Sequence, residues 1–336
     1  MRYLPYILLT AYAGFTLACS PSATRSAAAA PDSLPRGEGL VSTADSVQLF
    51  TRIVGTGPDT VVVLHGGPGF TLDYIAPDLG PLAAHHVLLF YDQRGAGRST
   101  LVPDSAGLDA ARFVDDLEAI RTHFHLDRLN LLGHSWGAGL AALYAIRFPA
   151  AIHQLLIVDG IPLRRTELIA GITAMNQSRD TAERNALQRW MDIRRAHPED
   201  AAACLAYYKI WFRPFFADPA ALSRSRGDFC AGTAESRRNK IQGVDRFTMA
   251  SIGDWDWRAG LATFPARTLI IHGTVDPLPF AGAEEWAATL PNARLVALPG
   301  VGHFPYLEAP AAFFSAIDTF LAGNWPPDAR PGHPAP

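Results

Sequence analysis

Short apolar runs alternate along the chain with longer stretches in which apolar residues recur at helical spacing. Solid apolar runs are typical of parallel strands that are covered by helices on both faces of a sheet. The alternation therefore predicts an α/β fold with a doubly wound, mostly parallel sheet. The expected strands are 46–54 (half-exposed), 60–65, 86–92, 129–134, 154–159, 267–273 and 294–300, and the clearest helices are 108–124, 137–148 and 309–322.

One long segment interrupts this alternation. From about residue 161 to residue 258 helical patterns continue, but apolar strand runs do not occur. We expect 161–258 to form a helical lid, or cap, inserted between core strands, where it would cover a site at the strand ends. The α/β core would then consist of 39–160 and 259–323.

The first 19 residues differ from the body of the chain. Arg2 is followed by an apolar stretch, 3–18, that is shorter than the roughly 20 residues needed to span a bilayer. This pattern predicts a secretory signal peptide, and "TLAC", ending at Cys19, is similar to a bacterial lipoprotein site whose cysteine is lipidated. Thr16 stands where leucine is usual, and cleavage within 26–30 is the alternative. We expect an exported protein, either periplasmic or anchored to the membrane through Cys19.

Composition changes this picture little. Hydrophobic residues make up 49% of the 336 positions, and a net charge of −3 without a long basic run argues against nucleic-acid binding. Segments 20–38 and 324–336 are rich in proline and small residues, which predicts a flexible linker and a disordered tail. Cys204 and Cys230 remain as an even pair, for which an exported chain favours a disulfide; two buried thiols are the alternative.

The segment Gly133–Gly137 has the pattern G-x-S-x-G and lies between an apolar strand and a helix rich in alanine and leucine. This context predicts a nucleophile elbow, a sharp turn that presents Ser135 at the start of the helix. Small neighbours are needed because the turn is strained, and free N–H groups at the helix start favour developing negative charge. The alternative is a small residue at an ordinary strand–helix junction.

A serine hydroxyl is a poor nucleophile until a base takes its proton. His303, in a glycine-flanked loop between a strand and the last helix, is the candidate base. Asp276, shortly after strand 267–273, is the candidate acid that orients the imidazole, in the chain order Ser, Asp, His. Asp159 is the competing acid, which we otherwise expect to cap the start of the lid. Structural or pocket-lining roles are expected for His65, His134 and His272.

Two N–H donors are expected for the oxyanion of a tetrahedral intermediate. The backbone N–H of Trp136, directly after the nucleophile, supplies one. The loop 64–70, "LHGGPGF", supplies the other, and Gly67 is the candidate because a glycine N–H can face the site without a side chain in the way. Pro68 stiffens the loop and has no N–H. A glycine-rich turn without a role in the chemistry is the alternative.

Three stretches carry a resemblance: 65–69 (HGGPG), 91–100 (YDQRGAGRST) and 133–145 (GHSWGAGLAALYA). With the aspartate and histidine loops, they resemble the α/β-hydrolase superfamily and, within it, the proline iminopeptidase branch, over about 40–160 and 258–322. The resemblance implies that the serine, aspartate and histidine named above form a catalytic triad beside the two oxyanion donors. It also implies a mainly structural Arg94 and neither a metal nor an organic cofactor.

The lid departs from that branch. Proline iminopeptidases bind the free amino terminus of the substrate with lid carboxylates, one of them typically in a tryptophan-rich helix. The tryptophan-bearing stretch here, 205–216, contains Lys209 and Arg213 and no glutamate. These two cations lie on a solvated helix face or favour an anionic substrate. The acids elsewhere in the lid are Glu199, Asp218 and Glu235.

These observations predict an exported serine hydrolase that acts through an acyl-enzyme on a small peptide or a small ester. The first hypothesis is an aminopeptidase that removes an N-terminal proline or another small residue. The second is a carboxylesterase or lactonase. A ligand receptor or adhesion module on the same fold is the alternative outside enzymes, although such proteins often lack triad members that this chain retains.

Overall fold

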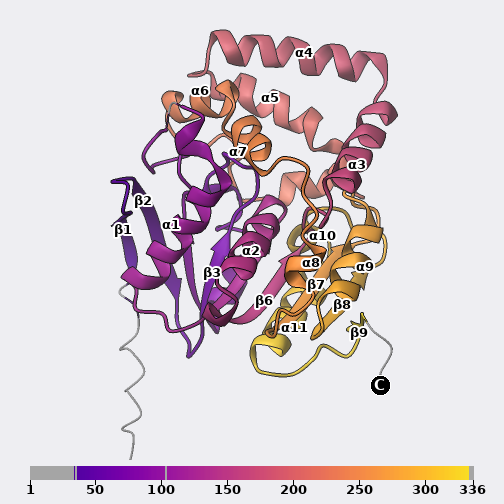
Figure 1. Cartoon of the computed structure of the whole chain (residues 1–336). Coiled ribbons are helices and arrows are strands. Elements are labelled where there is room, and N and C mark those ends of the chain that lie inside the picture. Colours follow the sequence, from indigo (N-terminus) through magenta and orange to yellow (C-terminus); the bar gives the residue numbers. More distant parts are fainter. Residues whose placement is uncertain (1–33, 35, 103, 333–336) are drawn as a thin grey trace, which may run out of the picture. The chain divides into compact units, whose positions relative to one another are not determined.

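The computed structural model describes residues 34, 36–102 and 104–332, so the predicted signal peptide and Cys19 lie outside the described residues. These residues form a sheet in the order β1-β2-β4-β3-β5-β6-β7-β8-β9 (Figure 1). The six strands from β4 to β8 in this order run parallel, whereas β1, β2 and β9 pair antiparallel with their neighbours. The strands are β1 Gly37–Ser42, β2 Gln48–Gly55, β3 Thr60–Leu64, β4 Val87–Tyr91, β5 Leu129–His134, β6 Ile152–Val158, β7 Arg267–Gly273, β8 Ala293–Leu298 and β9 Arg330–Pro331.

Each face of the sheet has its own hydrophobic core, because successive residues of a strand point to opposite faces. Leu131 of β5 belongs to the core that also contains apolar residues of α1 (Ala110–His123), α2 (Trp136–Arg147) and α9 (Phe280–Thr289). Leu132 belongs to the core shared with α11 (Pro310–Leu321). Covered faces on both sides explain the solid apolar runs, and the predicted fold class is confirmed.

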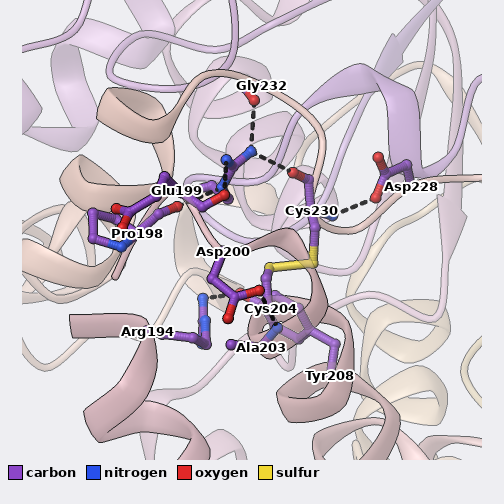
Figure 2. Close-up of a disulfide and its surroundings, with 11 residues drawn as sticks. Arg194, Pro198, Glu199, Asp200, Ala203, Cys204, Tyr208, Asp228, Cys230 and Gly232 are labelled. Carbon is purple, nitrogen blue, oxygen red and sulfur yellow. Dashed lines mark hydrogen bonds between the residues drawn. A yellow bond between two sulfur atoms is a disulfide. The ribbon is translucent and has the colours of Figure 1, made fainter. Parts of the chain in front are cut away.

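The segment between β6 and β7 forms the helical cap, which lies beyond one end of the sheet in Figure 1. A disulfide between Cys204 and Cys230, with a Cα–Cα distance of 6.0 Å, ties α5 to the loop before α6 (Figure 2). The structure thus has the bridge and not the two thiols. The cap helices are α3 Arg165–Ser178, α4 Thr181–Ala196, α5 Ala201–Trp211, α6 Ala234–Gln242, α7 Val244–Ile252 and α8 Arg258–Leu261.

The disordered tail predicted for 324–336 is wrong for 324–332. The chain folds back there, and β9 pairs with β8. Trp325 packs against Phe320 with ring centres 5.3 Å apart, and Ala329 is buried. Aromatic burial therefore outweighs the high proline content of this stretch.

The linker predicted for 20–38 also ends too late, since β1 begins at Gly37. The reason is that β1 is an edge strand held by main-chain pairing to β2, which requires no apolar pattern. Among the helices that the structure describes, none is long and apolar enough to cross a bilayer.

Candidate active site

Ser135 occupies a sharp turn between β5 and α2. Its backbone has φ 58° and ψ −121°, in a region that residues other than glycine rarely adopt. A Cβ atom at Gly133 would lie 2.5 Å from the carbonyl oxygen of Gly137, and one at Gly137 would lie 2.1 Å from that of Leu64. Only glycine fits at either position, so the motif is small on both sides of the serine for a steric reason.

His303 and Asp276 are joined by a short hydrogen bond. His303 lies between β8 and α10 (Pro305–Glu308) and is 3% exposed; its Nδ1 is 2.6 Å from Oδ2 of Asp276, which follows β7. The other oxygen of Asp276 accepts from the Leu278 N–H at 2.9 Å. Ser135 and His303 line one cavity, although within the described residues no hydrogen bond links the serine hydroxyl to the imidazole.

Asp159 does not cap the lid, contrary to expectation. It is fully buried at the end of β6, where its Oδ1 accepts from the Gly273 N–H at 2.8 Å, while α3 begins without a side-chain cap. The carboxylate is hydrogen-bonded to the end of the neighbouring strand β7, so it does not cap a helix of the lid. Possible ligand atoms of Asp159, His272 and Asp276 lie within 4.8 Å of one another, close enough for a metal ion, but Asp276 is engaged by His303.

Burial sets the protonation states of His303, Asp159 and Asp276. It lowers the pKa of His303 to about 3, so the imidazole is neutral at neutral pH, as a general base must be. Burial also raises the pKa of Asp159 and of Asp276 well above the usual value, and two adjacent carboxyl groups resist double ionisation.

The two predicted oxyanion donors lie at the same cavity as Ser135. Trp136 is the first residue of α2, where backbone N–H groups lack intrahelical acceptors. Gly67 has φ 128°, which favours glycine. Among the described residues neither amide has an acceptor, so both are available to a ligand oxygen.

This cavity, which we call the main cavity, has a volume of about 380 Å³ and a largely apolar wall. Its charged lining residues are Asp245 and Arg246 of α7. Lys209 and Arg213 are exposed and do not line it; Arg213 pairs with Glu183. The lid acids named from the sequence are also exposed and away from it: Glu199, Asp218 and Glu235.

A comparison with known families agrees with this geometry. Residues 59–310 match the family model described as the alpha/beta hydrolase fold. The chain belongs to the alpha/beta hydrolase fold family. The resemblance stated from the motifs is thereby confirmed at the level of the superfamily.

Individual relatives show which members of this family the chain is similar to. A proline iminopeptidase of Levilactobacillus brevis is 29% identical over 300 residues, which cover 82% of this chain and 94% of the relative. The crystal structure of a Mycobacterium smegmatis proline iminopeptidase covers 85% of this chain and 98% of its own, with a TM-score of 0.64 and 24% identity. An esterase from Exiguobacterium antarcticum covers 84% and 98%, with a TM-score of 0.62 and 20% identity. The predicted likeness to proline iminopeptidases is confirmed, and the relatives support a hydrolase.

In this alpha/beta hydrolase, a chain of hydrogen bonds that the sequence did not reveal connects the site loops. The Gly66 N–H donates to the hydroxyl of Tyr74 at 2.6 Å, and that hydroxyl lies 2.7 Å from Nδ1 of His134. Nε2 of His134 is 3.0 Å from the carbonyl oxygen of His303. A tautomer with hydrogen on Nε2 satisfies every contact, so Tyr74 and His134 hold the loop 64–70, the turn at Ser135 and the loop of His303 in register.

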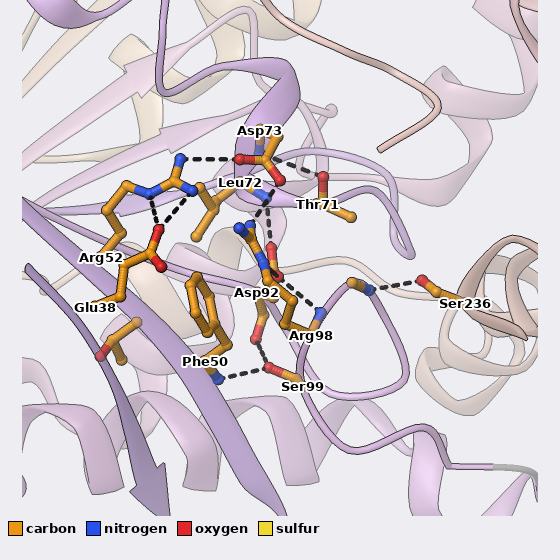
Figure 3. A network of polar contacts seen from close by, with 12 residues as sticks. Glu38, Phe50, Arg52, Thr71, Leu72, Asp73, Asp92, Arg98, Ser99 and Ser236 are labelled. Carbon is orange, nitrogen blue, oxygen red and sulfur yellow. Dashed lines mark hydrogen bonds and ion pairs between the residues drawn. The ribbon is translucent and has the colours of Figure 1, made fainter. Parts of the chain in front are cut away.

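A second network fixes the loop that follows β4 (Figure 3). Asp92 is fully buried; its carboxylate accepts from the N–H groups of Leu72 and Arg98 at 2.8 and 2.9 Å. Ser236 of the cap accepts from the Gly97 N–H at 2.7 Å. The loop therefore connects the core to the cap. Its signal in the sequence is the glycine-rich stretch 91–100, but the partner positions could not be read from it.

Gln93 and Arg94 of the same loop contact different parts of the core. The Gln93 side chain donates to the His65 carbonyl oxygen at 2.8 Å and accepts from the Trp136 indole at 3.0 Å. This places Gln93 between the loop 64–70 and the start of α2. Arg94 is buried against Asp116 at 2.6 Å, a structural role.

Proposed function

We propose that this protein is a serine hydrolase that cleaves a small amide or ester through an acyl-enzyme, with Ser135 as nucleophile, His303 as base and Asp276 as the orienting acid. One observation supports it most. Ser135, whose backbone conformation is strained, lies at the same cavity as a buried, neutral histidine. Nδ1 of that histidine is hydrogen-bonded to a carboxylate at 2.6 Å. That arrangement leaves Nε2 as the proton acceptor on the cavity side.

The mechanism follows from these positions. Ser135 Oγ adds to the carbonyl carbon while Nε2 of His303 takes the hydroxyl proton. The N–H groups of Gly67 and Trp136 donate to the resulting oxyanion. His303 then gives the proton to the leaving amine or alcohol, the carbonyl–leaving-group bond breaks, and an acyl ester remains on the serine. A water molecule, deprotonated by His303, then adds to the carbonyl carbon of that ester. The bond to Ser135 Oγ breaks, His303 returns the proton to Oγ, and the acid is released.

The proposed substrate is a short peptide with N-terminal proline or another small residue. The full-length relatives with the name proline iminopeptidase support this choice. Asp245, which lines the main cavity, offers a carboxylate for a substrate ammonium group. The apolar wall would accept a proline ring or a small aliphatic side chain.

A second candidate is a carboxylesterase or lactonase. The charge of Asp245 is opposed by the neighbouring Arg246, which lines the same cavity. Among the described residues no glutamate of the lid lines this cavity, so a second carboxylate for a substrate ammonium group is missing there. Rates on a prolyl anilide and on a short acyl ester separate the candidates. Turnover of the anilide with a free amino group, and loss of that turnover when the amine is acetylated, would support the aminopeptidase. Turnover of the ester alone would discard it.

Export and lipid attachment at Cys19 belong to the same proposal. The basic and apolar start of the chain and the "TLAC" box support them. The Cys204–Cys230 bridge agrees with an oxidising compartment. In a bacterial host, full-length protein should fractionate with membranes, and Cys19→Ala should move it out of them. Retention of residues 1–18 in the mature protein would contradict export.

A further inference from the structure

A second cavity, of about 240 Å³, adjoins the main cavity, and we call it the side cavity. Its outer wall comes from α4, α5, α6 and α7 of the cap. Anything bound there would lie next to the proposed oxyanion loop. The residues that line both cavities are Gly67, Pro68, Phe70, Trp211 and Asp245.

Lys240 of α6 reaches the side cavity from one wall. Its Nζ lies 3.3 Å from the centre of the Phe70 ring and donates to the carbonyl oxygen of Pro68 at 3.3 Å. Burial lowers the pKa of this lysine to about 7. Among the described residues it forms no ion pair; the groups in contact with its charge are an aromatic face and a carbonyl dipole, and the carboxylate of Asp245 acts on it from a greater distance.

Arg194 of α4 lines the same cavity and is 3% exposed. Its guanidinium lies over the rings of Tyr207 and Tyr208 at 4.4 and 4.8 Å, and one nitrogen is 3.3 Å from the Tyr208 hydroxyl. Nε has no acceptor among the described residues, and no carboxylate pairs with the side chain. Figure 2 shows Arg194 and Tyr208 beside the disulfide, which anchors this part of the cap.

Arg194 is buried and Lys240 is half-buried, and neither forms an ion pair with a carboxylate among the described residues. This is unusual, because charges withdrawn from water in proteins are normally paired. Within the described residues the side cavity has one acidic lining residue, Asp245, and that side chain is exposed. The interior therefore carries an excess of positive charge. An ammonium ligand is disfavoured, since the aromatic faces that would receive it already hold Lys240 and Arg194.

We infer that the side cavity binds a carboxylate group of the substrate, held by Lys240 and Arg194 next to the reacting carbonyl. The inference rests on the proposed function, because it assigns a substrate class to the site of Ser135. The positive charge that would bind it comes from Lys240 and Arg194 in the cap, whereas the sequence pattern had pointed to Lys209 and Arg213. The carboxylate could belong to the acyl group or to the leaving group, and the two cases are separated below.

Matched ester pairs test this inference on the full-length protein. For the acyl side, mono(para-nitrophenyl) glutarate is compared with para-nitrophenyl pentanoate, which has the same chain length without the charge. For the leaving side, the butyryl ester of para-hydroxyphenylpropionate is compared with that of its amide. The readout is the ratio of kcat/KM within a pair, which does not depend on the fraction of active protein. We expect at least one ratio to favour the anion by about tenfold.

Variants show whether the two cations cause the preference. Lys240→Met and Arg194→Met should each reduce the ratio several-fold, and Lys240→Arg should restore most of it because it keeps the charge. Lys209→Met is the matched control, since this exposed lysine lies on α5 outside both cavities and should leave the ratio unchanged.

Ratios near one in both pairs, a preference for the neutral ester, or a preference that survives both methionine variants would overturn the inference. The proposed function fails separately: no turnover of any ester, together with no covalent labelling of Ser135 by a fluorophosphonate, would reject the hydrolase itself.

Discussion

Two buried carboxylates, Asp276 and Asp159, are candidates for the acid of the proposed triad, and replacing each by asparagine distinguishes them. In Asp276→Asn, the oxygen that accepts from the Leu278 N–H at 2.9 Å should keep that bond, which turns the new NH₂ group toward Nδ1 of His303. Nδ1 must then accept, so the imidazole hydrogen moves to Nε2, where a lone pair is needed. We expect kcat to fall by about 10⁴-fold, or about 5 kcal/mol of barrier, with little loss of folding.

In Asp159→Asn, the oxygen that accepts from the Gly273 N–H at 2.8 Å keeps its partner, and the new NH₂ group replaces Oδ2, which has no hydrogen-bond partner among the described residues. We expect kcat to stay within about tenfold of the wild type. The assay is steady-state hydrolysis of a short ester, with thermal unfolding of both variants as the control for folding. Equal losses in the two variants, or an Asp276→Asn enzyme that keeps a tenth of its kcat, would refute this assignment.

Three further outcomes follow from the structure. Gly137→Ala, whose Cβ would lie 2.1 Å from the Leu64 oxygen, should lower the free energy of unfolding by about 2 kcal/mol or more and reduce turnover. Replacing Cys204 and Cys230 by alanine opens a loop of sequence separation 26 and should cost about 3.5 kcal/mol in denaturant unfolding. The preference for anionic esters should decline as pH rises through about 7, where Lys240 loses its charge, and an unchanged ratio would contradict this.

Much of the fold was predictable because its physics is local. Apolar runs such as 129–134 and 267–273 need no alternation when helices cover both faces of the sheet, and the structure has β5 and β7 there. The elbow could be located because a strained turn requires glycine at fixed offsets from Ser135. Strand, turn and helix follow one another in the sequence, so the context is visible without tertiary information.

The parts that were missed depend on partners far away in the chain. Asp159 bonds to Gly273, 114 residues later, and no local pattern records that contact. Tyr74 reaches His134 across 60 residues in the same way. The cap is the extreme case: it looks like a polar helical segment, and only packing shows that Arg194 is buried and faces a cavity.

Covalent labelling shows directly whether Ser135 is the nucleophile. A fluorophosphonate probe is incubated with the wild type, with Ser135→Ala and with His303→Ala, and the labelled peptide is identified by mass spectrometry. We expect one adduct, on Ser135, which is absent in Ser135→Ala and slow to form in His303→Ala. An adduct that persists in Ser135→Ala, or a wild type that hydrolyses esters without ever being labelled at residue 135, would contradict it.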